Sequence, residues 1–164
     1  MIPTSFKNLN YFLNGLSYHG RVQEVTPPKV EIKTEEDRSG GLDTPVEHDM
    51  GTNVLIGEFS ASHYDAEIAK TFGKPGQTHV FKGTYVDLSK AENNVTITMT
   101  GMTKAIDPGS WKSGSNAPCK ATTTCVYYKL EINGAVIHEI DALNMVRIID
   151  GVDQLAAQRA ALGI

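Results

Sequence analysis

The sequence is poor in cysteine: Cys119 and Cys125 are the only two. If the segment between them is extended, they lie roughly 20 Å apart at about 3.3 Å per residue. A disulfide needs Cα atoms within about 7 Å of each other. We therefore expect two free, partly buried thiols, and a fold that is held by its core rather than by a covalent cross-link.

Long apolar runs and basic clusters are also missing. No stretch approaches the ~20 apolar residues of a membrane span, and Met1 to Lys7 lack the apolar run of a signal peptide. We expect synthesis in a cytoplasm without export by that route. The chain holds 15 Lys and Arg against 19 Asp and Glu, a net charge of -4. Because phosphate binding needs concentrated positive charge, this balance argues against duplex nucleic acid as a bound ligand, and a mildly acidic surface would let DNA pass without specific binding.

Recognisable catalytic and metal-binding patterns are missing as well. The five histidines are scattered, and none is paired at the i and i+4 spacing of a metal motif. The acidic run Glu35 to Asp37 is interpreted as a solvated strand end rather than a cation site. No Gly-rich phosphate loop, nucleophile elbow or Cys/His pairing is present. The sequence therefore predicts no catalytic residue, metal or cofactor, and an enzyme is the weakest interpretation.

Two hairpin signals stand out among the features that are present. Asn14-Gly15 and Asn133-Gly134 each separate short runs that are alternating or rich in aromatic residues. Asn-Gly supplies the positive φ angles that a type I′ turn needs at both central positions. The flanking strands are predicted at 9–14, 17–26, 120–132 and 135–141. In the last hairpin, Val126, Tyr128, Leu130 and Ile132 are expected to share one face.

The rest of the chain reads as further strands and two helices. Alternation of Val95, Ile97 and Met99 with threonines predicts a strand with one core face. The further strands are predicted at 29–37, 53–61, 78–88, 94–106 and 143–149. In the strand at 53–61, the side chains expected to share one face are Leu55, Phe59 and Ala61.

An apolar stripe predicts a helix over 63–72, with Ser62 as its N-cap. The stripe consists of Tyr64, Ile68, Ala69 and Phe72. Asp150 is predicted to cap a final helix over 152–162, with Gly163 at its end.

These elements fit one domain, residues 1–164. We predict an α+β fold dominated by antiparallel sheet, with two packed sheets forming a sandwich or partial barrel. One helix is expected to flank the sheets, and a second helix to lie at the C-terminus.

Two long loops are predicted, at 37–52 and 107–118. Loops of this length in a compact domain are usually functional or disordered. The first carries apolar side chains at four-residue spacing, but Pro45 argues against a continuous helix. The second holds the only tryptophan, Trp111. It is either a ligand-stacking residue or a packing anchor against another chain, and we favour the anchor.

Four segments carry a resemblance that spans nearly the whole chain. They are the opening NLNYFLNGLSYHGRVQEVTPPKV, the loop DRSGGLDTPVEHDMG, the stretch KAIDPGSWKSG and the ending YYKLEINGAVIHEIDALNMVRIIDGVDQLAAQRAALGI. In this order they resemble the major tail tube protein of contractile-tailed (myovirus-type) bacteriophages, and the tube protein of R-type pyocins is similar in the same segments. Residues 62–92 depart most from that pattern.

The resemblance implies a structural subunit of the inner tail tube. Six subunits would form a ring whose inner strands join into one β-barrel, and stacked rings would make a hollow conduit that pierces the host envelope and passes DNA. The implied partners are further copies of the chain, a contractile tail sheath protein, a tape measure protein in the lumen, a baseplate initiator and a tube terminator. The implied location is the virion, after assembly in the host bacterial cytoplasm.

The resemblance also makes residues 37–52 an arm that reaches adjoining subunits and the next ring. Leu42, Val46 and Met50 become interface anchors, and Arg38 a candidate for an ion pair with a neighbouring Asp or Glu. The expected subunit and ring interface consists of Arg38, Gly40, Gly41, Leu42, Pro45, Val46, Asp49, Met50, Gly51, Trp111, Asn144, Arg147 and Asp150.

Two alternatives stay open at this point. Within the same class, the chain could form the tube of a phage-derived bacteriocin, a type VI secretion machine or another contractile injection system. In a different class, it could be a monomeric β-sandwich that binds a small ligand, with Trp111 stacking on that ligand. A stable monomer with saturable binding would distinguish the second alternative.

Overall fold

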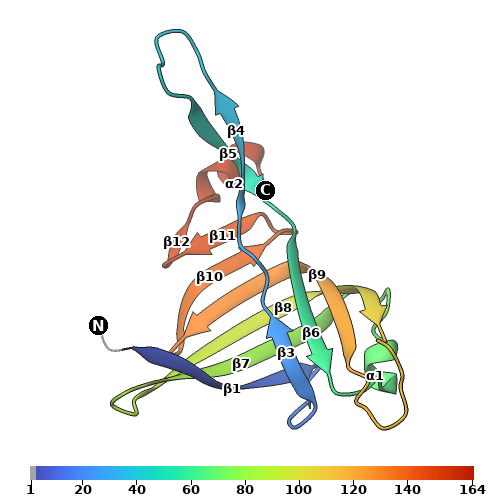
Figure 1. Ribbon diagram of the computed structural model, residues 1–164. Coiled ribbons are helices and arrows are strands. Elements are labelled where there is room, and N and C mark those ends of the chain that lie inside the picture. The colour runs from blue at the N-terminus through green and yellow to red at the C-terminus, as the bar shows by residue number, and fades with distance from the viewer. Residues whose placement is uncertain (1–2) are drawn as a thin grey trace.

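The computed structural model describes residues 3–164 as a strongly curled antiparallel sheet with a projecting hairpin (Figure 1). Its strands are β1 (Thr4–Leu13), β2 (Leu16–Ser17), β3 (Val22–Thr26), β4 (Ile32–Asp37), β5 (Val46–Thr52), β6 (Leu55–Ala61), β7 (Gln77–Asp87), β8 (Glu92–Asp107), β9 (Cys119–Ile132), β10 (Ala135–Asp141), β11 (Val146–Ile149) and β12 (Val152–Asp153). Its helices are α1 (Ala66–Ala69) and α2 (Ala156–Leu162).

The large sheet has ten strands in the order β12-β11-β10-β9-β8-β7-β1-β2, while β6 pairs with β9 and β3 pairs with β6. Strands β4 and β5 form a second, two-stranded sheet. The expected mainly antiparallel α+β class, with one flanking and one C-terminal helix, is confirmed. Over the described residues the ten-stranded sheet is curled but not closed.

Both predicted Asn-Gly turns are confirmed. Asn14 and Gly15 have φ angles of 48° and 84°, and Asn133 and Gly134 have φ angles of 51° and 80°, as a type I′ turn requires. The strand predicted over 17–26 is wrong as a single element. Strand β2 ends at Ser17, the buried Tyr18 turns the chain, and β3 then pairs with β6 instead of β1.

The sheet forks at a β-bulge in β9. Thr100 on β8 pairs with Tyr127, and the next residue of β8 pairs with Cys125, so Val126 is skipped. Before the bulge β9 pairs with β6, and after it with β10. The prediction that Val126 shares the face of Tyr128 is therefore wrong: the extra residue shifts the alternation, Val126 is exposed and Tyr128 is buried.

The core lies between β6 and the inner face of β1, β7 and β8. Leu55, Phe59 and Ala61 are buried as predicted. The Phe59 ring stacks on Tyr11 of β1, with ring centroids 4.2 Å apart. Cys119 and Cys125 are both buried and free, which confirms the expected thiols.

A histidine is enclosed in this aromatic core. His79 is fully buried, with Tyr11 Oη 2.7 Å from its Nδ1 and Thr123 Oγ1 3.4 Å from its Nε2. Neutral imidazole offers one donor and one acceptor, so two hydroxyl groups satisfy it. Burial lowers the pKa of His79 to about 4. The imidazole is therefore neutral in the folded protein near pH 7.

Both predicted helices exist but are shorter than expected. Helix α1 begins after Asp65, whose carboxylate accepts from the Ile68 amide at 3.0 Å, so the N-cap is Asp65 and not Ser62. Ile68 is buried, whereas Tyr64 and Phe72 of the expected stripe are exposed. Ser62 is held in the preceding segment, where its amide donates to the Arg21 carbonyl at 2.7 Å.

The start of the last helix is also a correction. Val152 and Asp153 form β12 against β11, and α2 begins only at Ala156. Asp150 has a φ of 49° in the turn before β12, so it does not cap the helix. Gly163 ends the helix in the left-handed conformation, as predicted. Within residues 3–164, no helix has the length and apolar character needed to cross a membrane.

The loop predicted at 37–52 is wrong in its second half. Residues from Val46 to Thr52 form β5, which pairs with β4. The polar sequence of this strand hides it, since neither face of the hairpin is packed into the core and no apolar alternation is needed. The loop expected over 107–118 is confirmed except at its first residue, which still belongs to β8.

Candidate assembly interface

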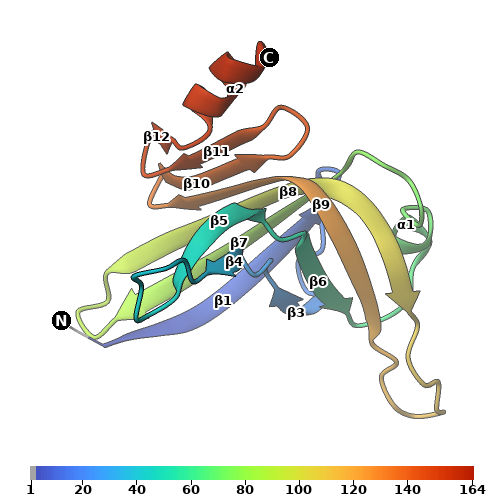
Figure 2. The same ribbon diagram turned by 90° about the horizontal axis from the view of Figure 1, so that it is seen from above.

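The most prominent surface feature is the arm, which we define as the β4–β5 hairpin, residues 32–52. It projects from one end of the curled sheet, away from α1 and the 108–118 loop (Figures 1 and 2). Leu42, Val46 and Met50 are 43%, 47% and 51% exposed. A two-stranded hairpin is marginally stable alone in water. The arm therefore depends on support at its base, and its exposed apolar side chains make it a candidate contact surface.

An ion pair supports the base of the arm. Arg147 on β11 is buried, and its guanidinium donates to Asp49 on β5, with Nη2 2.5 Å from Oδ2 and Nη1 3.4 Å from Oδ1. The Asp49 carboxylate also accepts the Gly51 amide at 2.8 Å. The hydrogen bonds from Arg147 and then from Gly51 lower the pKa of Asp49. The arm is thus fixed to the body through a bidentate ion pair.

A groove of about 560 Å³ opens beside this ion pair. It runs between the arm base, β10, β11 and α2, and its apolar lining includes Met50, Met145 and Leu155. Helix α2 has no buried residue, and Arg159 holds it by bonding Asp153 and the Met145 carbonyl. A helix this short is marginal without tertiary packing, so we expect a partner to cover it in an assembly.

The structure brings together part of the residue set expected at the interface. Asp49 and Arg147 form the ion pair, and Met50 and Gly51 line the groove beside it. The remaining arm residues lie in the exposed tip or at the start of β5: Arg38, Gly40, Gly41, Leu42, Pro45 and Val46. In the free subunit Arg38 donates to the Asp43 carbonyl at 2.8 Å within that tip.

Three other expected interface residues lie elsewhere or have local roles. Trp111 is 71% exposed in the 108–118 loop, at the far end from the arm, and its Nε1 donates to the Pro108 carbonyl at 3.0 Å. Asn144 donates to Asp141 at 2.7 Å and shapes the β10–β11 turn. Asp150 lies in the turn before β12. Whether these residues meet another subunit stays a prediction.

Sequence reasoning missed two features of this region. Glu36 and Glu47 face each other directly across the arm, which a loop assignment could not show. Arg159 and Asp153 lock α2, but their six-residue separation runs from the end of β12 across a turn into the helix, so it matches no helical pairing rule. For the first feature the sequence offered no local signal, because the strand after Pro45 buries neither face.

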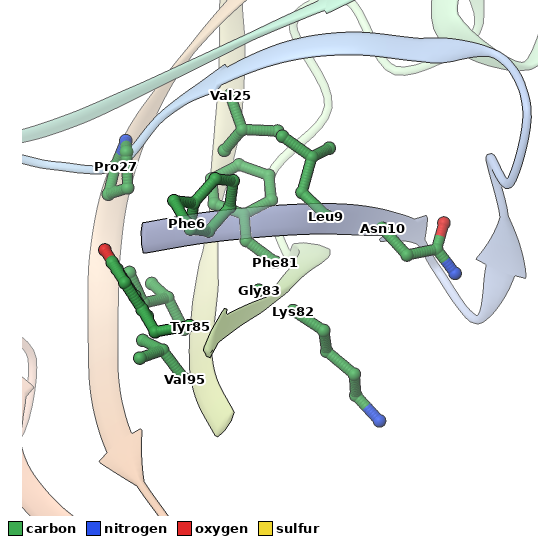
Figure 3. A pocket seen from close by; sticks show the side chains of 11 residues that line it. Phe6, Leu9, Asn10, Val25, Pro27, Phe81, Lys82, Gly83, Tyr85 and Val95 are labelled. Carbon is green, nitrogen blue, oxygen red and sulfur yellow. The ribbon is translucent and has the colours of Figure 1, made fainter. Parts of the chain in front are cut away.

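A second hollow, of about 270 Å³, lies at the open seam between β1, β3, β7 and β8 (Figure 3). Phe6, Phe81 and Val95 are among its apolar side chains, whereas Asn10 and Lys82 point away from the aromatic rings of the two phenylalanines. Small-ligand sites combine an apolar lining with a few convergent polar groups. Trp111, the stacking residue of the ligand-binding alternative, lines neither this hollow nor the groove.

Replacing Asp49 with Asn is expected to loosen the arm base at neutral pH, because the buried Arg147 loses its counter-charge. Amide hydrogen exchange of Val46–Thr52 should quicken, while that of β6 stays unchanged. Asp43→Asn, which removes an arm acid without an ion pair in the described chain, is the matched control. Equal exchange in the two variants would contradict the anchoring role.

The same contact has a defined pH dependence. A carboxylate with a lowered pKa stabilises the fold above its unfolded pKa of about 3.9 and loses that effect as the pH falls through its folded value. Protection of Val46–Thr52 in the unchanged protein should therefore be flat from about pH 5 to 8 and fall only below about pH 4.

Comparisons with known proteins bear on this arrangement. Over residues 3–163 the chain matches the family described as phage tail tube protein FII. It is 33% identical over 170 residues to the tail tube protein of Escherichia phage P2, covering 99% of each chain. It is 26% identical over 161 residues to the major tail tube protein of Serratia phage KSP20, covering 92% of this chain and 90% of that one.

Two solved structures share the fold. The sheath/tube terminator of the PVC extracellular contractile injection system, in its extended state, has a TM-score of 0.58 at 8% identity, over 75% of this chain and 92% of the terminator. The sheath-tube complex of the same system has a TM-score of 0.55 at 8% identity, over 75% of this chain and 87% of that one. At this identity the likeness is one of fold alone.

Proposed function

The chain belongs to the phage tail tube protein FII family, and on that basis we propose that its copies form six-membered rings that stack into the hollow inner tube of a contractile tail. The subunit is a structural component of the virion, and its family is not one of enzymes. The tube would act as a passive piercing rod and as a conduit for DNA.

The arm is the observation that carries this proposal. It leaves the body at one end, exposes Leu42, Val46 and Met50, and is held at a fixed base by Asp49 and Arg147. A hairpin with a fixed base and exposed apolar side chains fits insertion between neighbouring subunits. The arm projects from the end of the body opposite α1 and the 108–118 loop. A contact between the arm of one copy and the opposite end of the next is head-to-tail, and such a contact repeats along a filament.

Open sheet edges support ring closure. Residues 4–11 of β1 pair with β7 on one side only, and the sheet ends at β12 on its other border. Exposed edges promote uncontrolled pairing unless they are covered, and closing strands around a ring removes them. We propose that the neighbouring subunit covers these edges and α2, and that the inner strands of a ring form one barrel.

The proposed partners follow from the tube. A sheath protein would surround it, a terminator and a baseplate initiator would bound it, and a tape measure protein would occupy the lumen. The solved structures that share the fold are described as a sheath/tube terminator and a sheath-tube complex, which supports the sheath and the terminator as partners. DNA would pass without specific binding, since the net charge is -4. A phage-derived bacteriocin would use the same subunit.

Negative-stain electron microscopy with light scattering tests the proposal. The purified, concentrated protein, or the protein co-expressed with its initiator and sheath, is expected to form rings and stacked hollow tubes of one diameter. A monomer at every concentration, with and without those partners, would contradict it.

A further inference from the structure

The net charge of the chain is concentrated in the arm. Residues 32–52 hold six acidic side chains and two basic ones, so the arm accounts for the whole net charge of -4. The remaining residues hold equal numbers of acids and bases, thirteen of each. A neutral body with an acidic projection favours docking of the projection on a basic surface.

A local feature of the arm also points to a cationic partner. Glu36 and Glu47 are directly opposed in the β4–β5 register, and both are exposed. Neither carboxylate takes part in an ion pair within residues 3–164. Like charges directly opposite on two strands destabilise the pair. The free subunit thus carries a repulsion that a cation from another chain would relieve.

The opposite end of the body carries exposed lysines, which we call the lysine end: Lys74, Lys104 and Lys112. Lys74 and Lys104 lie on adjacent backbones, because the Gly73 amide donates to the Thr103 carbonyl at 3.0 Å. Lys112 follows the exposed Trp111 in the 108–118 loop. None of the three takes part in an ion pair of the described chain, whereas the nearby Lys70 and Lys120 are paired with Glu67 and Glu58.

We propose that the arm docks, through Glu36 and Glu47, on the lysine end of the next copy along the tube. The inference rests on the proposed tube function and names the partner surface of the arm. In Figure 1 the arm and the segments of the lysine end, namely the connection from α1 to β7, the end of β8 and the 108–118 loop, lie at opposite ends of the molecule. Stacking copies in one orientation therefore brings the acidic hairpin of one to the lysines of the next.

Charge exchange tests the contact in the full chain. Glu36→Lys removes the repulsion with Glu47, so the free subunit should unfold at an equal or higher urea concentration. The same variant should need about tenfold more protein to form tubes, because the arm now meets like charge. Lys104→Glu should weaken tube formation similarly. Glu36→Lys combined with Lys104→Glu should restore assembly to within about threefold of the unchanged chain.

Two controls separate the proposal from its rivals. Lys90→Glu, in the β7–β8 turn, should change assembly little. Lys82→Glu, on the outer sheet face, would rescue Glu36→Lys only if the arm docks laterally within a ring, and such rescue would overturn the axial contact. Normal assembly of Glu36→Lys alone, or no rescue by Lys104→Glu, would also overturn it. Failure of the unchanged chain to form tubes under any condition would overturn the tube function as well.

Discussion

A chain in which residues 35–48 of the arm are replaced by Asn-Gly, between Thr34 and Asp49, is expected to fold normally and to form no tubes. Thr34 and Asp49 are directly opposed in the β4–β5 register, so a two-residue turn can join them. The replaced residues, Glu35 to His48, are all exposed. The retained Asp49 still pairs with Arg147, so the body keeps its buried ion pair while the assembly loses the arm.

Light scattering and negative-stain microscopy measure the assembly, and the urea midpoint measures the fold. The replacement removes five acids and one base, so its net charge approaches zero and the experiment is run at about pH 8.5 to maintain solubility. A shorter replacement, of Ser39 to Thr44 alone, keeps both strands and serves as the control for loop length. Ordinary tubes from the chain without Glu35–His48 would refute the role of the arm.

Acid is expected to destabilise the folded subunit in a window set by His79. Its folded pKa of about 4 lies below the unfolded value of about 6.5, so the unfolded chain binds the proton first. The contribution of neutral His79 is therefore complete above about pH 6.5 and is lost as the pH falls toward about 4. A shift of this size corresponds to about 3 kcal/mol in the free energy of unfolding.

Urea unfolding at about pH 7 and pH 4.5 measures this loss. His79→Gln keeps an acceptor near the Tyr11 hydroxyl but cannot take up a proton, so its stability should be lower at neutral pH and nearly independent of pH in this window. His63→Gln, at an exposed histidine, should retain the pH dependence of the free energy of unfolding that the unchanged chain shows. If His79→Gln lost as much stability between these two pH values as the unchanged chain, another group would be responsible for the loss.

The parts of the fold that were predicted correctly depend on neighbours in the sequence. Asn-Gly fixes a type I′ turn through the φ preferences of two residues, so both turns could be located. Alternation along 53–61 and 94–106 likewise identified β6 and β8, since each strand has one buried face. These patterns act over a few residues and need no knowledge of the partner strand.

The errors arose where a distant partner decides the structure. Val126 falls on the bulge because β6 and β10 both pair with β9 from the same side. Strand β5 was missed for a different reason: it pairs only with the preceding strand β4 and buries no face, so no buried apolar alternation marks it. The candidate site shows the same limit: Asp49 and Arg147 were both named from the family resemblance, but their pairing spans 98 residues and no local pattern reveals it.

The fork at Val126 has a mechanical consequence. The curled body and the β10–β12 layer share β9 as one continuous strand, so no flexible linker separates them. A load that pulls the layer along the direction of β9 is passed through its covalent backbone into the ladder with β8. That ladder is then loaded in shear, with many hydrogen bonds resisting at once rather than opening one after another. A rod under compression and twist gains stiffness from such a shared strand without any cross-link between its cysteines.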